Sequence, residues 1–152
     1  MGVHGEERVP SVTPSIGTAA YSVGDAIGGL MTVGDAAAQH SGGVLSYVSV
    51  VDLAKNNTPM DVLFYKEAIT PTADNSEMDA GDTDLTSHFM FKVSILAGDY
   101  VSLADNSVAT SPPTAYPFRA DGTGSIYAQA RMAGTATMAV GDLTFKFGIM
   151  RD

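Results

Sequence analysis

The side chains in this sequence that are best able to do chemistry are its carboxylates. Five of them fall within a short interval: Asp74, Glu77, Asp79, Asp82 and Asp84. Closely spaced carboxylates supply the hard oxygen ligands that Ca²⁺ prefers. The run from Asp79 to Asp84, however, lacks the ligand register of an EF-hand loop and has no Glu at the twelfth position. Because Asp is common at helix N-caps and turns, the favoured interpretation is a solvated, helix-capping loop.

The three histidines, His4, His40 and His88, lie far apart in the sequence. A hydrolytic triad needs a nucleophile, a base and an orienting acid within reach of one another, and no nucleophile-elbow motif surrounds any Ser. The glycine pairs at 28–29 and 42–43 match neither a phosphate loop nor a dinucleotide fingerprint. The sequence therefore predicts no catalytic residue, no cofactor and no metal ligand.

The overall composition argues against several classes of partner. The chain has 152 residues, enough for one domain with a substantial core, and no Cys that could form a disulfide or a thiolate site. Its net charge of −9 would be repelled by nucleic-acid phosphates and by anionic membranes. No apolar run approaches the length of a membrane span, and the first residues predict neither a signal peptide nor a lipid anchor. We therefore expect no nucleic acid and no membrane among its partners.

The patterning that must position any functional residue is that of β-strands. Many Gly and Pro together with few charged residues disfavour a helical bundle. Two strand-like runs, 44–53 and 61–67, are separated by polar residues and Pro59, and we interpret them as an antiparallel pair. Other segments with strand-like patterns are 26–33, 89–95, 100–103, 126–132 and 143–149. In the first of these, Gly28 and Gly29 predict a bulge or a close backbone approach.

Two long connections complete the expected architecture. Residues 68–88 hold the acidic cluster and are expected to contain one or two helical turns. Residues 104–123 form a turn-rich interval stiffened by three prolines. The recurring Gly-Asp pairs, as at 24–25 and 141–142, predict tight turns. The whole pattern predicts an all-β fold, an antiparallel β-sandwich of jelly-roll or Greek-key type, with an up-and-down barrel as the alternative.

Two segments are candidates for binding other proteins. Residues 1–20 are expected to form an extended N-terminal arm, followed by a single sandwich domain over 21–152. The arm is either a frayed terminus or a segment that clasps a neighbouring subunit. The Pro-rich interval carries residue types that are enriched at interfaces, although its aromatics would also suit the edge of a sandwich. The candidate capsid or inter-subunit contact residues are Val9, Pro10, Val12, Pro14, Tyr116, Phe118 and Arg119.

An ordered series of short motifs carries a family resemblance. The motifs are Tyr21-Ser-Val-Gly-Asp25-Ala-Ile-Gly-Gly29, Ser41-Gly-Gly-Val-Leu-Ser46, Val62-Leu-Phe-Tyr65, Asp74-Asn75, Asp84-Leu85, and Leu143 to Ile149 followed by Arg151-Asp152. This series resembles small virion structural proteins of tailed bacteriophages, and within them it is most similar to head decoration, or cement, proteins. The resemblance covers residues 21–152 and includes no catalytic residue.

The resemblance implies a non-enzymatic β-sandwich subunit, forming a homotrimer, that binds the major capsid protein and stabilises the shell. Such a protein is made in the host cytoplasm and becomes part of the capsid surface of the virion. A trimer gains from multivalency, because three weak contacts act together. The alternative is a receptor- or glycan-binding module of a phage fibre or tail tip, which the absence of Trp disfavours. A glycan hydrolase is a third possibility, and it would need a pair of carboxylates across a cleft.

Overall fold

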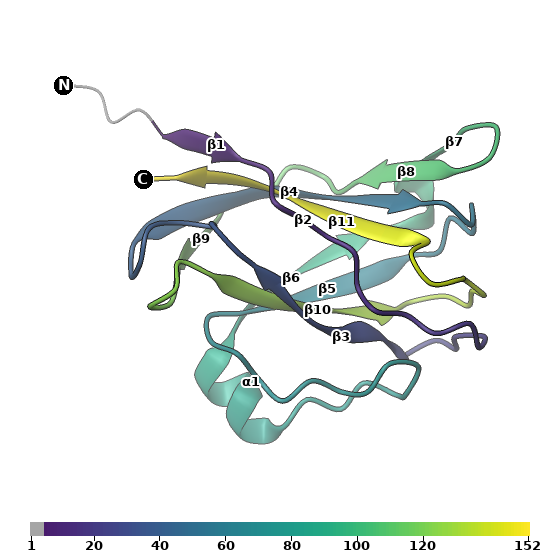
Figure 1. The fold of residues 1–152 in the computed structure, drawn as a ribbon, viewed down its shortest axis with the longest axis horizontal. Helices are drawn as coiled ribbons and strands as arrows, with labels where there is room; N and C mark the ends of the chain where they lie inside the picture. Colours follow the sequence, from purple (N-terminus) through teal and green to yellow (C-terminus); the bar gives the residue numbers. More distant parts are fainter. Residues whose placement is uncertain (1–4) are drawn as a thin grey trace.

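The computed structural model describes residues 5–152 and places them in two antiparallel sheets that pack face to face (Figure 1). The larger sheet contains seven strands: β1 (Glu6–Arg8), β2 (Ser11–Val12), β4 (Gly42–Asp52), β7 (Tyr100–Ser102), β8 (Ser107–Thr110), β9 (Tyr116–Arg119) and β11 (Leu143–Arg151). The smaller sheet contains four: β3 (Ala26–Val33), β5 (Met60–Tyr65), β6 (Phe89–Ile95) and β10 (Ile126–Met132). The expected all-β sandwich is confirmed, and the jelly-roll or Greek-key subtype stays a prediction.

The strand order defines which edges of the sandwich are open to other chains. The larger sheet runs β1-β11-β4-β8-β7, with β2 also beside β11 and β9 beside β4. The smaller sheet runs β3-β10-β5-β6. The short helix α1 (Asp82–His88) and the long connection before it lie outside the smaller sheet (Figure 1). A single 3-10 turn, Ala97–Asp99, leads from β6 to β7.

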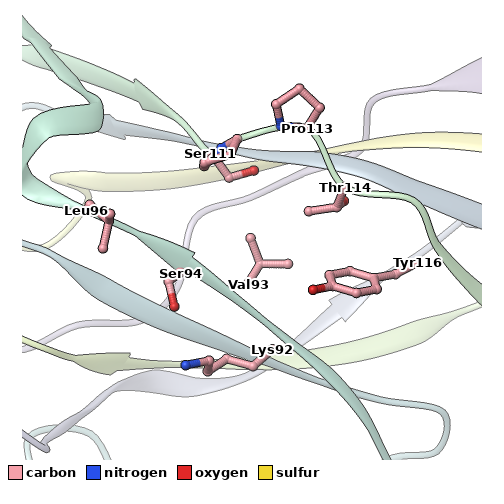
Figure 2. A pocket seen from close by; sticks show the side chains of 9 residues that line it. Lys92, Val93, Ser94, Leu96, Ser111, Pro113, Thr114 and Tyr116 are labelled. Atoms are coloured by element: carbon pink, nitrogen blue, oxygen red, sulfur yellow. The ribbon is translucent and has the colours of Figure 1, made fainter.

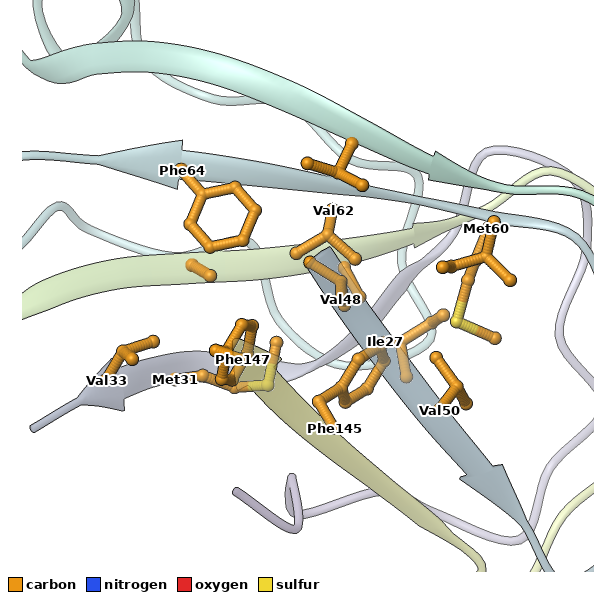
Figure 3. Close-up of a cluster of buried hydrophobic side chains, with 14 of the residues drawn as sticks. Ile27, Met31, Val33, Val48, Val50, Met60, Val62, Phe64, Phe145 and Phe147 are labelled. Carbon is orange, nitrogen blue, oxygen red and sulfur yellow. The ribbon is translucent and has the colours of Figure 1, made fainter. Parts of the chain in front are cut away.

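The core lies between the two sheets and follows from period-two patterning. Phe145 and Phe147 of β11 alternate with outward-facing residues, and both rings are fully buried. The ring of Phe147 meets Phe64 of β5 edge to face, with 5.7 Å between ring centroids. Val48 and Val62 complete this contact from the two sheets (Figure 3). Burying each such side chain stabilises the fold by about 1.5–3 kcal/mol, which makes these strands the framework of the molecule.

The two strands expected as an antiparallel pair both exist, but they do not pair with each other. β4 lies in the larger sheet and β5 in the smaller one, so the prediction of their pairing was wrong. Each strand buries one face, and those faces meet across the core, which requires residues 53–59 to cross between the sheets. The carboxylate of Asp52 accepts hydrogen bonds from the backbone N–H groups of Ala54, Asn56 and Asn57, which fixes this crossing.

The crossing is supported from the other side by Tyr100. Its hydroxyl donates to the carbonyl of Thr58 at 2.8 Å. Burial, followed by the nearby carboxylates of Asp52 and Asp99, raises the pKa of Tyr100. The phenol therefore remains a hydrogen-bond donor well into alkaline pH and keeps the crossing segment in place.

The expected loop over residues 104–123 also differs from the structure, because it contains β8 and β9. β8 has only two buried positions, Ser107 and Ala109, which is too short a pattern for alternation to be recognised. β9 contains Pro117, which usually argues against a strand. β9 pairs with β4 alone, and at such an edge a missing backbone N–H leaves no partner unsatisfied.

From residue 5 onwards, the segment expected to be an N-terminal arm lies against the sandwich of its own chain. β1 pairs with the end of β11, where Glu6 lies opposite Arg151, and β2 pairs with β11 at Val12 and Phe145. Further along, Ile16 is buried in the core. Residues 6–12 therefore contribute to the edge of the larger sheet, and Pro14 and Ile16 pack against Gly28 and the core.

The close backbone approach expected in the first long strand is present at Gly28. Its φ is +64°, and a Cβ at this position would lie 2.7 Å from the Cβ of Pro14. The pairing of β3 with β10 shifts register opposite this point, between Ala128 and Ala130. Gly28 thus permits both the bulge and the passage of the N-terminal segment across β3.

Gly28 and its neighbour provide a matched test of this geometry. Gly28→Ala should lower the free energy of unfolding by about 1–3 kcal/mol, because the new methyl group meets Pro14 and the backbone is left-handed. Gly29→Ala places a methyl group where no atom lies within 4 Å, and it should change stability by less than about 0.5 kcal/mol. Urea unfolding followed by circular dichroism measures both, and equal effects would contradict the assigned close approach.

Candidate contact surfaces

The histidines and carboxylates singled out in the sequence do not gather into one site. His40 is exposed in the turn before β4, and His88 ends α1. His4 lies outside the described residues. Within residues 5–152, no three His, Asp or Glu side chains meet in a geometry that would hold a metal ion. The same residues contain no helix with the length and apolar character needed to cross a membrane.

Asp74, the first of the acidic cluster, holds three parts of the chain together. Its carboxylate accepts hydrogen bonds from the Tyr21 hydroxyl at 2.7 Å and from the backbone N–H groups of Gly17 at 2.8 Å and Gly28 at 2.6 Å. Burial raises the pKa of Tyr21, and the Asp74 carboxylate raises it further. Asp82 and Asp84 lie in the first turn of α1, where negative charge complements the helix dipole.

Gln129 pins the same long connection onto the smaller sheet. Its side chain is buried although it lies on the outer face of β10. The amide nitrogen donates to the carbonyls of Thr72 and Gly28, and the amide oxygen accepts from the N–H of Thr72. The Gln129 side chain thus bonds both backbone groups of Thr72, and it holds the long connection in one position over the smaller sheet.

Four of the five Gly-Asp pairs form turns, as predicted, whereas the pair at 81–82 begins helix α1. In three of them the Asp carboxylate accepts the backbone N–H of the residue three positions earlier, at 2.6–2.8 Å. The bonded pairs are Ser22 with Asp25, Leu96 with Asp99, and Ala139 with Asp142. Gly24 and Gly141 have positive φ, the conformation that Gly adopts without strain. These carboxylates are therefore occupied in turn formation.

Asp121 organises the turn before β10 in a similar way. Its carboxylate accepts bonds from the hydroxyl and N–H of Thr123, from the N–H of Ser125 and from the hydroxyl of Tyr127. Desolvation raises the pKa of Asp121, but these hydrogen bonds outweigh it and hold the pKa well below the ordinary value of 3.8. The ionised form is the one that the folded turn requires.

The N-terminal residues expected to contact a partner are unequally accessible. Val9 is 45% exposed between β1 and β2, and Pro10 and Val12 are partly buried. Pro14 is buried, with its ring against Gly28. Val9 is therefore the most accessible of the four, and Pro14 packs inside its own chain.

The second expected contact group, in β9, is divided between the two faces of the strand. Phe118 is buried in the core, and its ring lies against Gly43. Tyr116 is on the same face at the sandwich edge, 38% exposed, with its ring stacked 4.7 Å from that of Phe91 in β6. Arg119 points to the outer face and is exposed. Tyr116 therefore joins the two sheets while still presenting part of its ring to solvent.

An apolar surface that the sequence did not reveal lies on the outer face of the larger sheet. Val101 of β7, Val108 of β8 and Val51 of β4 are directly opposite one another in the strand register, and we call them the valine row. Val101 is 60% exposed and Val108 is 38% exposed. The adjacent row across the same strands is polar, with Ser49 bonded to Thr110. An apolar strip beside a polar one is the arrangement found in protein interfaces.

The pKa of Asp121 leads to a pH-dependent prediction. Because this pKa is lowered on folding, the stability it contributes is present above about pH 4 and is lost as the pH falls through that value towards the folded-state pKa. Asp121→Asn should therefore reduce the free energy of unfolding at pH 7 by about 1 kcal/mol, with a smaller difference from the parent below about pH 4. Asp105→Asn, in an exposed turn, is the control. Urea titrations across this range decide the matter: a pH-independent deficit would contradict the role of the ionised carboxylate.

No protein-family model matches the sequence, and no curated protein matches it either. The surfaces described above and the motif resemblance are therefore the basis for a functional proposal.

Proposed function

We propose that this chain is a non-enzymatic structural protein of a tailed-bacteriophage virion, which binds the major capsid protein on the outer surface of the head and stabilises the shell. The observation that carries the proposal is the valine row. A soluble β-sandwich usually presents polar side chains on its outward sheet faces. Here three β-branched side chains lie in register at one end of the larger sheet, with Val101 and Val108 exposed and Val51 partly buried, and we interpret this apolar patch as an interaction surface.

Other features of the described chain agree with a contact function. Leu53 and Leu103, which directly follow β4 and β7, are about half exposed and extend the apolar character of this end of the sheet. Arg119 lies on the same outer face, towards the opposite end of β4. The carboxylates of Asp52, Asp74 and Asp121 accept hydrogen bonds from backbone N–H groups and fix the loops around them, which suits a rigid binding module. We propose a capsid as the partner because the motifs resemble those of head decoration proteins.

A trimer is the proposed working assembly. Three copies arranged about a three-fold position of the capsid lattice would present three outer sheet faces to the shell. Each contact alone can be weak, because linking the sites raises the effective concentration of the second and third. Tyr116 offers one partly exposed aromatic ring, and Phe91 covers one of its faces, so glycan binding at a fibre or tail tip has less support.

The proposal is tested with capsids that lack the protein. Co-sedimentation of purified protein with expanded capsids should be saturable, at a stoichiometry that is a multiple of three per lattice position. Absence of saturable binding would overturn the proposal, and a glycan-array screen would then examine the fibre-tip alternative.

The valine row is tested separately with two substitutions of equal exposure. Val101→Glu should weaken capsid binding about tenfold or more, because the carboxylate would have to be desolvated in the interface. Val23→Glu is the control, since Val23 is also 60% exposed but lies in a turn away from this face. Circular dichroism checks that both variants are folded. Equal binding of the two variants would remove the valine row from the interface.

A further inference from the structure

A groove of about 360 Å³ runs along one side of the sandwich, between the two sheets (Figure 2). One wall is formed by residues 92–94 of β6 and by Leu96 directly after it. The other wall is formed by residues 111–114 and Tyr116, the segment that joins β8 to β9 and begins β9. Val93 and Tyr116 both point into the space between the walls (Figure 2).

The edge of β6 faces this groove. In the described part of the chain, β6 is the last strand of the smaller sheet and pairs with β5 alone. Val93 is buried towards the core, whereas the Ser94 hydroxyl bonds to Asp61 on the opposite face. The two side chains point to opposite faces of β6, yet both line the groove. The groove must therefore run along the edge of this strand. An edge strand presents unpaired backbone N–H and C=O groups.

The opposite wall cannot pair with β6. Pro112 and Pro113 have no backbone N–H and therefore cannot donate to the strand edge. The residues on either side of them are fixed to the larger sheet, since the N–H groups of Ser111 and Thr114 donate to carbonyls of β4. The two prolines and the hydrogen bonds to β4 thus keep this wall apart from β6, so the groove is present without a ligand.

The lining of the groove defines the kind of segment that would fit. Its interior is apolar, formed by Val93 and by the Tyr116 ring that stacks on Phe91. Lys92 is the one charged side chain among the lining residues, and it lies 3.8 Å from Asp61. None of the residues among 5–152 that line the groove has a carboxylate, in a chain whose net charge is −9. This surface therefore favours an uncharged segment with alternate apolar side chains.

We propose that the groove binds an extended, uncharged segment of a partner protein, which adds to β6 as a fifth strand of the smaller sheet. The lining stretch 92–96 is about 15 Å long at 3.3 Å per residue, enough to pair with a segment of four or five residues. Main-chain hydrogen bonds supply affinity, and alternate side chains reach Val93 and Tyr116 to supply selectivity. A second copy would have to bring its whole sheet past Pro112 and Pro113, so a single extended segment is the better occupant. The site is separate from the valine row and does not depend on capsid binding.

The test uses the full chain and a short synthetic peptide of alternating Thr and Val with blocked ends. The peptide should slow hydrogen exchange of alternate β6 amides by about tenfold or more, and shift the Tyr116 ring resonances saturably in NMR spectra. The same peptide with N-methyl groups on alternate amides cannot pair and should leave exchange unchanged. Unchanged β6 exchange with the first peptide at millimolar concentration, or protection of a different edge strand, would overturn the proposal.

A substitution at the end of the groove places the peptide more closely. Leu96 is 57% exposed, and Leu96→Glu should weaken peptide binding about tenfold, because the bound peptide would desolvate the new carboxylate. Val140→Glu, on an exposed turn elsewhere, should bind as the parent does. Equal affinities of these two variants would contradict binding in the groove. Sedimentation that shows dimers protected at β6 without peptide would assign the edge to a second copy and overturn the proposal.

Discussion

The three hydrogen bonds accepted by Asp74 determine which side of this sandwich is covered and which is open. That carboxylate joins the N-terminal segment at Gly17, the hydroxyl of Tyr21 and the edge strand at Gly28. With the three bonds made by Gln129, it holds the long connection between β5 and α1 against the smaller sheet. The β3 edge is consequently occupied by the protein's own chain. The β6 edge has no such cover among the described residues, so the two ends of the sheet differ in what they offer to a partner.

The strands that could be predicted from sequence are those in which one face is buried over several residues. β10 and β11 alternate cleanly, and β6 does so over most of its length, because each packs one face on a common core. The pairing of strands could not be predicted in the same way. Hydrophobic period indicates which face of β4 and β5 is buried, but it contains no information about which strand lies beside them. Their separation into different sheets depends on Asp52 and on contacts distant in sequence.

The candidate surfaces were only partly accessible from sequence for a related reason. Aromatic and proline residues serve both interfaces and sandwich edges, so their types alone did not separate buried Phe118 from partly exposed Tyr116. The valine row required the register of three strands, one of which, β8, is too short to be recognised by pattern. The groove exists because β6 and residues 111–114 do not pair with each other. The absence of pairing between two segments produces no hydrophobic periodicity that could be recognised in the sequence. The strand at 89–95, the stiff proline interval and Tyr116 were each predicted from the sequence, but not that they face one another across a groove.

The buried phenols have a consequence for the behaviour of this fold in base. The pKa is raised for Tyr21, Tyr65 and Tyr100 chiefly by burial, and for Tyr127 chiefly by its hydrogen bond to Asp121. A group whose pKa is raised on folding contributes to the free energy of unfolding at every pH below its pKa in the unfolded chain, which is about 10 for tyrosine. That contribution is lost as the pH rises from there to the pKa in the folded protein. Tyrosinate formation and loss of structure are therefore linked in this protein. Alkali would act first on the three places where tyrosine hydroxyls hold the chain: the crossing from β4 to β5, the junction at Asp74 and the turn at Asp121.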